Sequence, residues 1–124
     1  MVENGLKIEY GQVGGVARMN HLTVLEGDHL SYIVRGEVRQ ERNVSLEQLQ
    51  GVIRLVDVLK VVQLKPDYGD DNTSDVIKHS LRVTSFQFHA EVNMHTNTVN
   101  DSPPIEVREL IKGLRTLFKE PQIT

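Results

Sequence analysis

The chain has 124 residues, a net charge of −3 and a pI of about 5.9, and 39 % of its residues are hydrophobic. This length predicts one domain, residues 1–124, with a single core. There is no cysteine, which excludes disulfides, thiolate nucleophiles and zinc ribbons. No basic stripe or long apolar run stands out, so we expect neither nucleic acid nor a membrane as partner. The first residues do not resemble a signal peptide, and a cytoplasmic protein is expected.

In chain order, apolar residues that alternate with polar ones predict strands, and apolar residues repeated every three to four positions predict helices. The strands lie at 6–10, 21–25, 30–35, 76–83 and 86–94, and the helices at 46–62 and 104–118. Gly27-Asp28 is a hairpin signal between the second and third strands. Ser45 and Gln48 have the spacing of a capping box at the first helix. Residues 36–44 fit either a strand or a loop.

This order of elements predicts an α+β fold, with an antiparallel sheet of about five strands and two amphipathic helices packed on one face. This is the simplest arrangement that buries the apolar stripes of both helices. The residues predicted to be buried are Ile8, Leu22, Val24, Leu49, Ile53, Val56, Leu81, Val83, Val92, Leu110, Ile111 and Leu114.

The segment KPDYGDDNTSD, residues 65–75, concentrates four aspartates where no core can form. A calcium loop counted from Asp67 would need glycine sixth and glutamate twelfth, but Asn72 and Lys78 stand there. The segment is therefore either a solvated connection or a loop that meets a partner.

The polar face of the strand at 86–94, continued to His95, is the best enzyme-like feature. His89, Glu91, Asn93 and His95 share one side of the strand, where two of them could contact one metal ion. The alternative is an ordinary solvated face. His79 lies on an apolar strand face, which favours a histidine at the edge of the core. No P-loop, nucleophile elbow or zinc-protease motif is present, so we expect no enzyme and no cofactor.

Four stretches, taken in order, resemble the emfourins, a family of bacterial protein inhibitors of thermolysin-like metalloproteases. The stretches are IEYGQVGGVAR, LEQLQGVIRLVDVL, YGDDNTSDVIKHSLRV and NDSPPIEVRELIKGL. They cover nearly the whole chain. The family's motif Ser-Gly-Gly-hydrophobic-Ala-Gly has Val13 in place of the serine and Arg18 in place of the last glycine. Ile77 and His79 stand where the family has two aromatic residues in a later strand.

The resemblance implies that two neighbouring loops block the protease, one offering an aspartate to the catalytic zinc and the other apolar side chains. If the strands alternate in direction and the first helix returns along the sheet, the Gly27-Asp28 hairpin and the loops at 64–75 and 97–104 share one end. The Gly14-Gly15 turn then falls at the other end. The predicted protease-binding residues are Asp28, Leu64, Pro66, Tyr68, Asp70, Asp71 and Asp101. In the alternative interpretation these aspartates are solvated or cap elements, and the chain is a non-catalytic interaction domain that shares only the fold.

Overall fold

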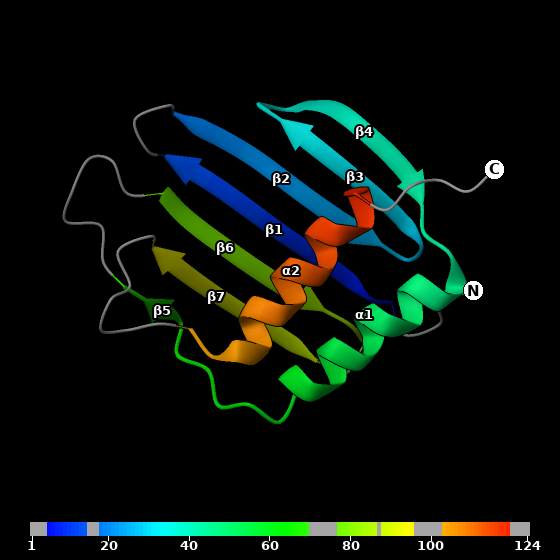
Figure 1. Ribbon diagram of the computed structural model, residues 1–124. Helices are drawn as coiled ribbons and strands as arrows, with labels where there is room; N and C mark the ends of the chain where they lie inside the picture. Colours follow the sequence, from blue (N-terminus) through cyan, green and yellow to red (C-terminus); the bar gives the residue numbers. More distant parts are fainter. Residues whose placement is uncertain (1–4, 15–17, 70–76, 87, 96–102, 120–124) are drawn as a thin grey trace.

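The computed structural model describes residues 5–14, 18–69, 77–86, 88–95 and 103–119 (Figure 1). Within them the chain forms seven strands and two helices. In chain order these are β1 (Lys7–Gly14), β2 (Met19–Glu26), β3 (His29–Val34), β4 (Glu37–Asn43), α1 (Leu46–Leu59), β5 (Asp67–Tyr68), β6 (Ile77–Thr84), β7 (His89–His95) and α2 (Ile105–Lys119).

All strands belong to one sheet with the order β4-β3-β2-β1-β6-β7-β5. Every pairing is antiparallel except that of β5, which runs parallel to β7. The α+β class is confirmed, but the sheet is larger than the predicted five strands and is mixed. The two additional strands are β4, whose residues are mostly polar, and β5, which has only two residues and therefore no period to detect.

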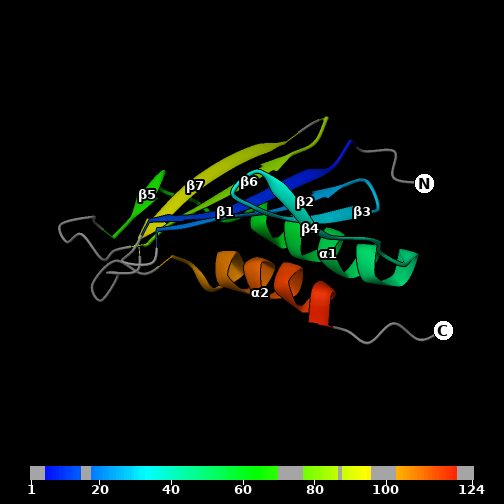
Figure 2. The ribbon, with the colours of Figure 1, turned by 90° about the horizontal axis from the view of Figure 1, so that it is seen from above.

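Both helices pack on the same face of the sheet, as predicted (Figure 2). The Ser45 hydroxyl accepts from the Gln48 amide at 3.1 Å, and the Gln48 side chain accepts from the Ser45 amide at 3.0 Å. The predicted capping box therefore starts α1. The second helix starts at the carbonyl of Pro104, which accepts from the amide of Val107 at 3.1 Å. Of the helices in the described ranges, neither has the length and apolarity to cross a membrane.

The core lies between the sheet and the two helices and is mostly aliphatic. The prediction was wrong for β2, where Thr23 and Leu25 are buried in place of Leu22 and Val24. The register explains the difference, because Leu25 pairs with Ile8, which is fully buried, and cross-strand partners face the same side. Leu22 and Val24 are half-buried, as are two further predicted core residues, Ile53 and Ile111.

The strand registers also define the two ends of the sheet. At one end Lys7 pairs with Glu26 and Thr84, and the hairpin Gly27-Asp28 follows directly; we call it the Asp28 end. At the other, Gly14 pairs with Ile77 and Tyr68 pairs with Met94; we call it the Tyr68 end.

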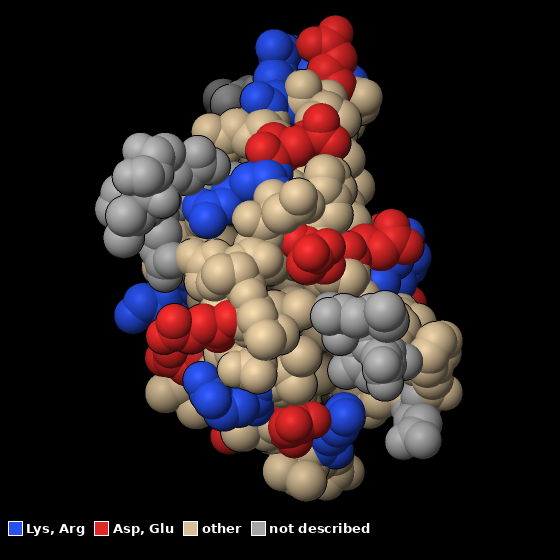
Figure 3. Space-filling model, turned by 90° about the vertical axis from the view of Figure 1, so that its right-hand side faces the viewer, with Lys and Arg blue, Asp and Glu red and all other residues tan. Residues whose placement is uncertain are grey.

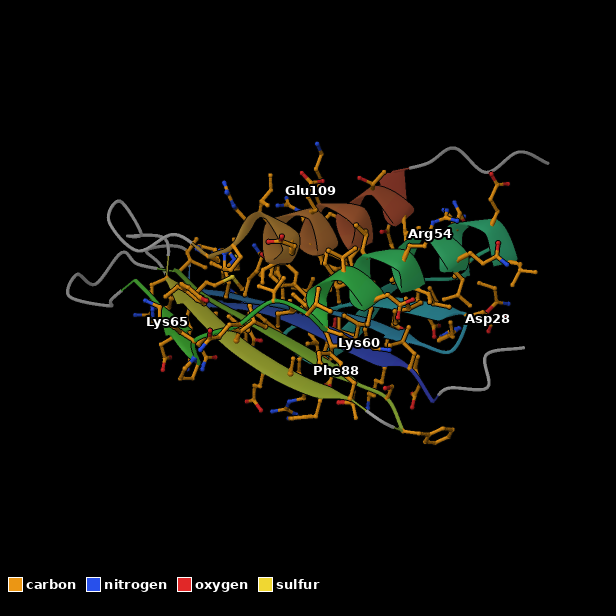
Figure 4. The ribbon with its side chains drawn as sticks, turned by 90° about the horizontal axis from the view of Figure 1, so that it is seen from below. Asp28, Arg54, Lys60, Lys65, Phe88 and Glu109 are labelled. Atoms are coloured by element: carbon orange, nitrogen blue, oxygen red, sulfur yellow. The ribbon has the colours of Figure 1, made fainter. Side chains whose placement is uncertain are left out.

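The predicted grouping of the loops was therefore wrong in part. Asp28 lies at the opposite end from Lys65, as Figure 4 shows. Gly14 lies at the opposite end from Asp28, as predicted, but it shares that end with Tyr68, which was predicted to lie beside Asp28. The cause is β4. Because this strand runs back to the Asp28 end, α1 starts there and runs toward the Tyr68 end.

Candidate functional site

At the Tyr68 end, residues 66–68 are hydrogen-bonded to β7. The carbonyl of Pro66 accepts from the amide of Asn93 at 2.8 Å, and Nδ1 of His95 donates to the carbonyl of Tyr68 at 3.3 Å. These contacts fix the backbone just before the aspartate-rich stretch. The segment thus has a rigid base on the edge of the sheet.

The side chain of Tyr68 is part of the core rather than of the exposed surface. Its exposed fraction is 4 %, and its hydroxyl oxygen accepts from the amide of Lys65 at 3.0 Å. The ammonium of Lys65 lies 4.9 Å from the centre of the Tyr68 ring, within the range of a cation–π contact. Of the predicted apolar residues here, Pro66 is exposed and Leu64 is half-buried. Tyr68 therefore anchors the segment, and Pro66 presents the more accessible apolar surface.

Three of the predicted aspartates, Asp70, Asp71 and Asp101, lie outside the described residues. The residues that flank them are described. Gly69 follows Tyr68, Ile77 pairs with Gly14, and His95 pairs with Lys78, so these flanks lie at the same end of the sheet. The stretch that leads into α2, residues 103–104, starts beside β5 (Figure 1). The two chain segments that carry the three aspartates thus both depart from and return to the Tyr68 end.

Asp28 occupies a different surface. It is exposed in the two-residue turn between β2 and β3, where Gly27 has a φ of 62°. Figure 3 faces this end and shows acidic and basic side chains intermixed over it. Asp28 therefore lies at the opposite end of the sheet from Tyr68.

The polar face of β7 is tied into contacts across the strands. A carboxylate oxygen of Glu91 lies 3.4 Å from Arg82 Nη2, and Arg82 also lies 3.9 Å from Glu9. The Ser80 hydroxyl donates to the Asn93 side chain at 3.0 Å. Among the residues that the structure describes, no group of three or more His, Asp or Glu side chains could hold a metal ion. The metal site considered for His89, Glu91 and His95 thus has no support from the geometry.

Two tyrosine–histidine pairs line the helix side of the sheet. The Tyr10 hydroxyl is 2.6 Å from Nδ1 of His79, and the Tyr32 hydroxyl is 2.8 Å from Nδ1 of His21. Only His79 was singled out from sequence, and its predicted place at the core edge is confirmed by its half-buried side chain. The pairings depend on strand register, so the sequence carried no direct signal for them.

No protein-family model matches the chain, and no curated protein matches it at a significant level.

Proposed function

We propose that this chain is a non-catalytic protein inhibitor of a thermolysin-like zinc metalloprotease, which it blocks with the Tyr68 end. The observation that carries the proposal is the position of the residues that flank two segments of the chain. The described flanks of the segments with Asp70, Asp71 and Asp101 lie at one end of the sheet, beside the anchored segment of Pro66. The ordered resemblance to emfourins supports the same interpretation.

The chemistry of such an inhibitor is simple. A catalytic zinc held by three protein ligands keeps a fourth position for water, and a carboxylate can take that position. An exposed apolar residue beside the carboxylate can fill a substrate pocket. We assign the second role to Pro66, which is exposed; its carbonyl already accepts from the amide of Asn93, so little order would be lost on binding.

The test is inhibition of a panel of thermolysin-like proteases by the purified chain. Asp70, Asp71 and Asp101 are then changed singly to alanine, and inhibition constants are measured. One of these changes should weaken inhibition by about 2 kcal/mol or more, because a zinc-bound carboxylate acts as a binding hot spot.

Asp28→Ala is the matched control, because it removes the same group from the opposite end of the sheet. Its effect should stay within the range of about 0–1 kcal/mol that is typical of surface charges. Small and equal effects of all four changes would contradict zinc capping. A wild-type chain that inhibits no protease of the panel would leave the interaction domain as the better interpretation.

A further inference from the structure

A second site lies away from the tips of the loops, on the helix side of the sheet. A pocket of about 460 Å³ lies between the strands β1–β4 and helix α2. The helices cover the sheet nearer the Asp28 end and leave these parts of the strands beyond their edge (Figure 1). Six of its lining residues carry the argument: Tyr10, Gln12, His21, Tyr32, Gln40 and Arg115.

The pocket arises because the inward face of the sheet changes from apolar to polar along the strands. On β1 the buried Ile8 is followed on the same face by Tyr10 and then by Gln12. On β2, Leu25 is buried opposite Ile8. In the same direction along the sheet, the next residues of β2 on this face are Thr23 and His21. The apolar residues fill the core under the helices, Tyr10 and Thr23 are buried at the edge of that core, and Gln12 and His21 are half-buried beyond it.

The aromatic and imidazole rings of this surface hold one another in place. Tyr10 and His79 are hydrogen-bonded at 2.6 Å and stacked with ring centres 5.9 Å apart. Tyr32 and His21 are hydrogen-bonded at 2.8 Å and meet edge to face at 5.6 Å. A concave site with a few polar groups held in fixed positions is the usual form of a small-molecule site.

The charge of the pocket has one sign. Among the described residues that line it, Arg115 is the charged one, and none is an aspartate or a glutamate. Within the described part of the chain Arg115 makes no ion pair. A neighbouring hollow of about 430 Å³ shares Arg115 and adds Arg108 and Lys112. The chain as a whole has a net charge of −3, so this flank of α2 is a local exception.

We propose that this pocket binds a small organic carboxylate. The guanidinium of Arg115 offers two parallel N–H donors, which match the two oxygens of a carboxylate. The side-chain amides of Gln12 and Gln40 can bond to polar groups on the rest of the molecule. One guanidinium among neutral hydrogen-bonding groups balances a single negative charge, and the volume falls within the range of small-molecule sites.

The experiment is a titration of the isotope-labelled full chain, followed by NMR, with 4-hydroxybenzoate, hexanoate and lactate. At least one carboxylate should give saturable shifts at the backbone amides of Gln12, His21 and Gln40. For the one that binds most tightly, the corresponding neutral amide should bind at least about tenfold more weakly, because it loses the charge-assisted pair.

Arg115→Gln should weaken binding of that carboxylate by a similar factor. Arg115 is exposed, so the variant should keep the dispersed spectrum of the folded chain. Arg54→Gln on the outer side of α1 makes the same charge change away from the pocket and should leave the dissociation constant within about twofold (Figure 4). No saturable shift with any of the three acids, equal binding of the amide, or unchanged binding by Arg115→Gln would each overturn the proposal.

Discussion

At His79 the surroundings of one side chain decide its charge. Burial lowers the pKa of His79 below its ordinary value of 6.5, and the neighbouring Arg115 and His95 lower it further. The neutral ring can accept a hydrogen bond from the Tyr10 hydroxyl, whose own pKa is raised by burial. The folded protein therefore binds a proton at His79 less readily than the unfolded chain does.

The first prediction is a pH dependence of stability that His79 causes. A lowered folded pKa gives a contribution that is complete above about pH 6.5 and is lost as the pH falls through that value toward the folded pKa. The free energy of unfolding in urea, measured from about pH 7.5 down to about pH 5, should decrease less steeply for His79→Gln than for the wild type. An unchanged slope in the variant would contradict this account.

His29 gives a control of opposite sign. Nε2 of His29 donates to the Glu41 carboxylate at 3.0 Å, which raises the pKa of this exposed histidine, and a second bond, donated by Nδ1 to the side-chain oxygen of Asn43 at 3.4 Å, adds to the effect. Its contribution is present below about pH 6.5 and is lost as the pH rises through the folded pKa. His29→Gln should therefore make the loss of stability toward acid steeper, whereas His79→Gln makes it shallower.

Among the elements, the helices were predicted best and the edge strands worst. A helix repeats its apolar positions over many residues, so the stripe of α2, with Val107, Leu110 and Leu114 buried, is visible from sequence alone. In β2 both faces carry apolar residues, and only pairing with β1 decides which face is buried. In β4 Val38 is the one apolar residue, and it is 53 % exposed.

Because residues 36–44 were not assigned as a strand from the sequence, the predicted position of Asp28 was wrong. Without β4 the path of the chain places Asp28 beside the acidic loop, whereas with β4 it places Asp28 at the far end. The pocket could not be predicted from the sequence for another reason. Gln12, Gln40 and Arg115 are distant in sequence, and only the sheet register and the position of α2 bring them together.

The second prediction compares two glycines in different elements. An added Cβ would meet no atom within 4 Å at either Gly27 or Gly51. Gly27 has a φ of 62° in its turn, where other residues are strained, so Gly27→Ala should lower the free energy of unfolding by about 1 kcal/mol. Gly51 lies within α1, where alanine is the better helix former, so Gly51→Ala should raise it by about 0.5–1 kcal/mol.

Urea denaturation of the two variants measures this difference. The two changes add the same methyl group, so opposite signs can only come from the backbone conformation. Effects of the same sign would show that the turn or the helix differs from its described form.

At the scale of the whole molecule, stability depends on the layer between sheet and helices. The strands β1 and β6 lie inside the sheet, with eight paired positions between them, and their residues Ile8 and Val83 are fully buried. Helix α2 covers this layer with Leu110, which is also fully buried. Removing atoms there affects both layers at once, whereas the exposed Leu46 of α1 touches little of the core.

The last prediction therefore contrasts two leucines. Leu110→Ala should lower the free energy of unfolding by about 2–5 kcal/mol, because it leaves a cavity that the packed surroundings fill only in part. Leu46→Ala, at a side chain that is 63 % exposed, should change it by no more than about 0.5 kcal/mol. Amide hydrogen exchange should show the same contrast: the slowest amides of β1 and β6 open only by global unfolding, so Leu110→Ala should speed their exchange by the factor that its loss of stability predicts. If those amides kept their wild-type rates while the free energy of unfolding fell, the two layers would not unfold as one unit.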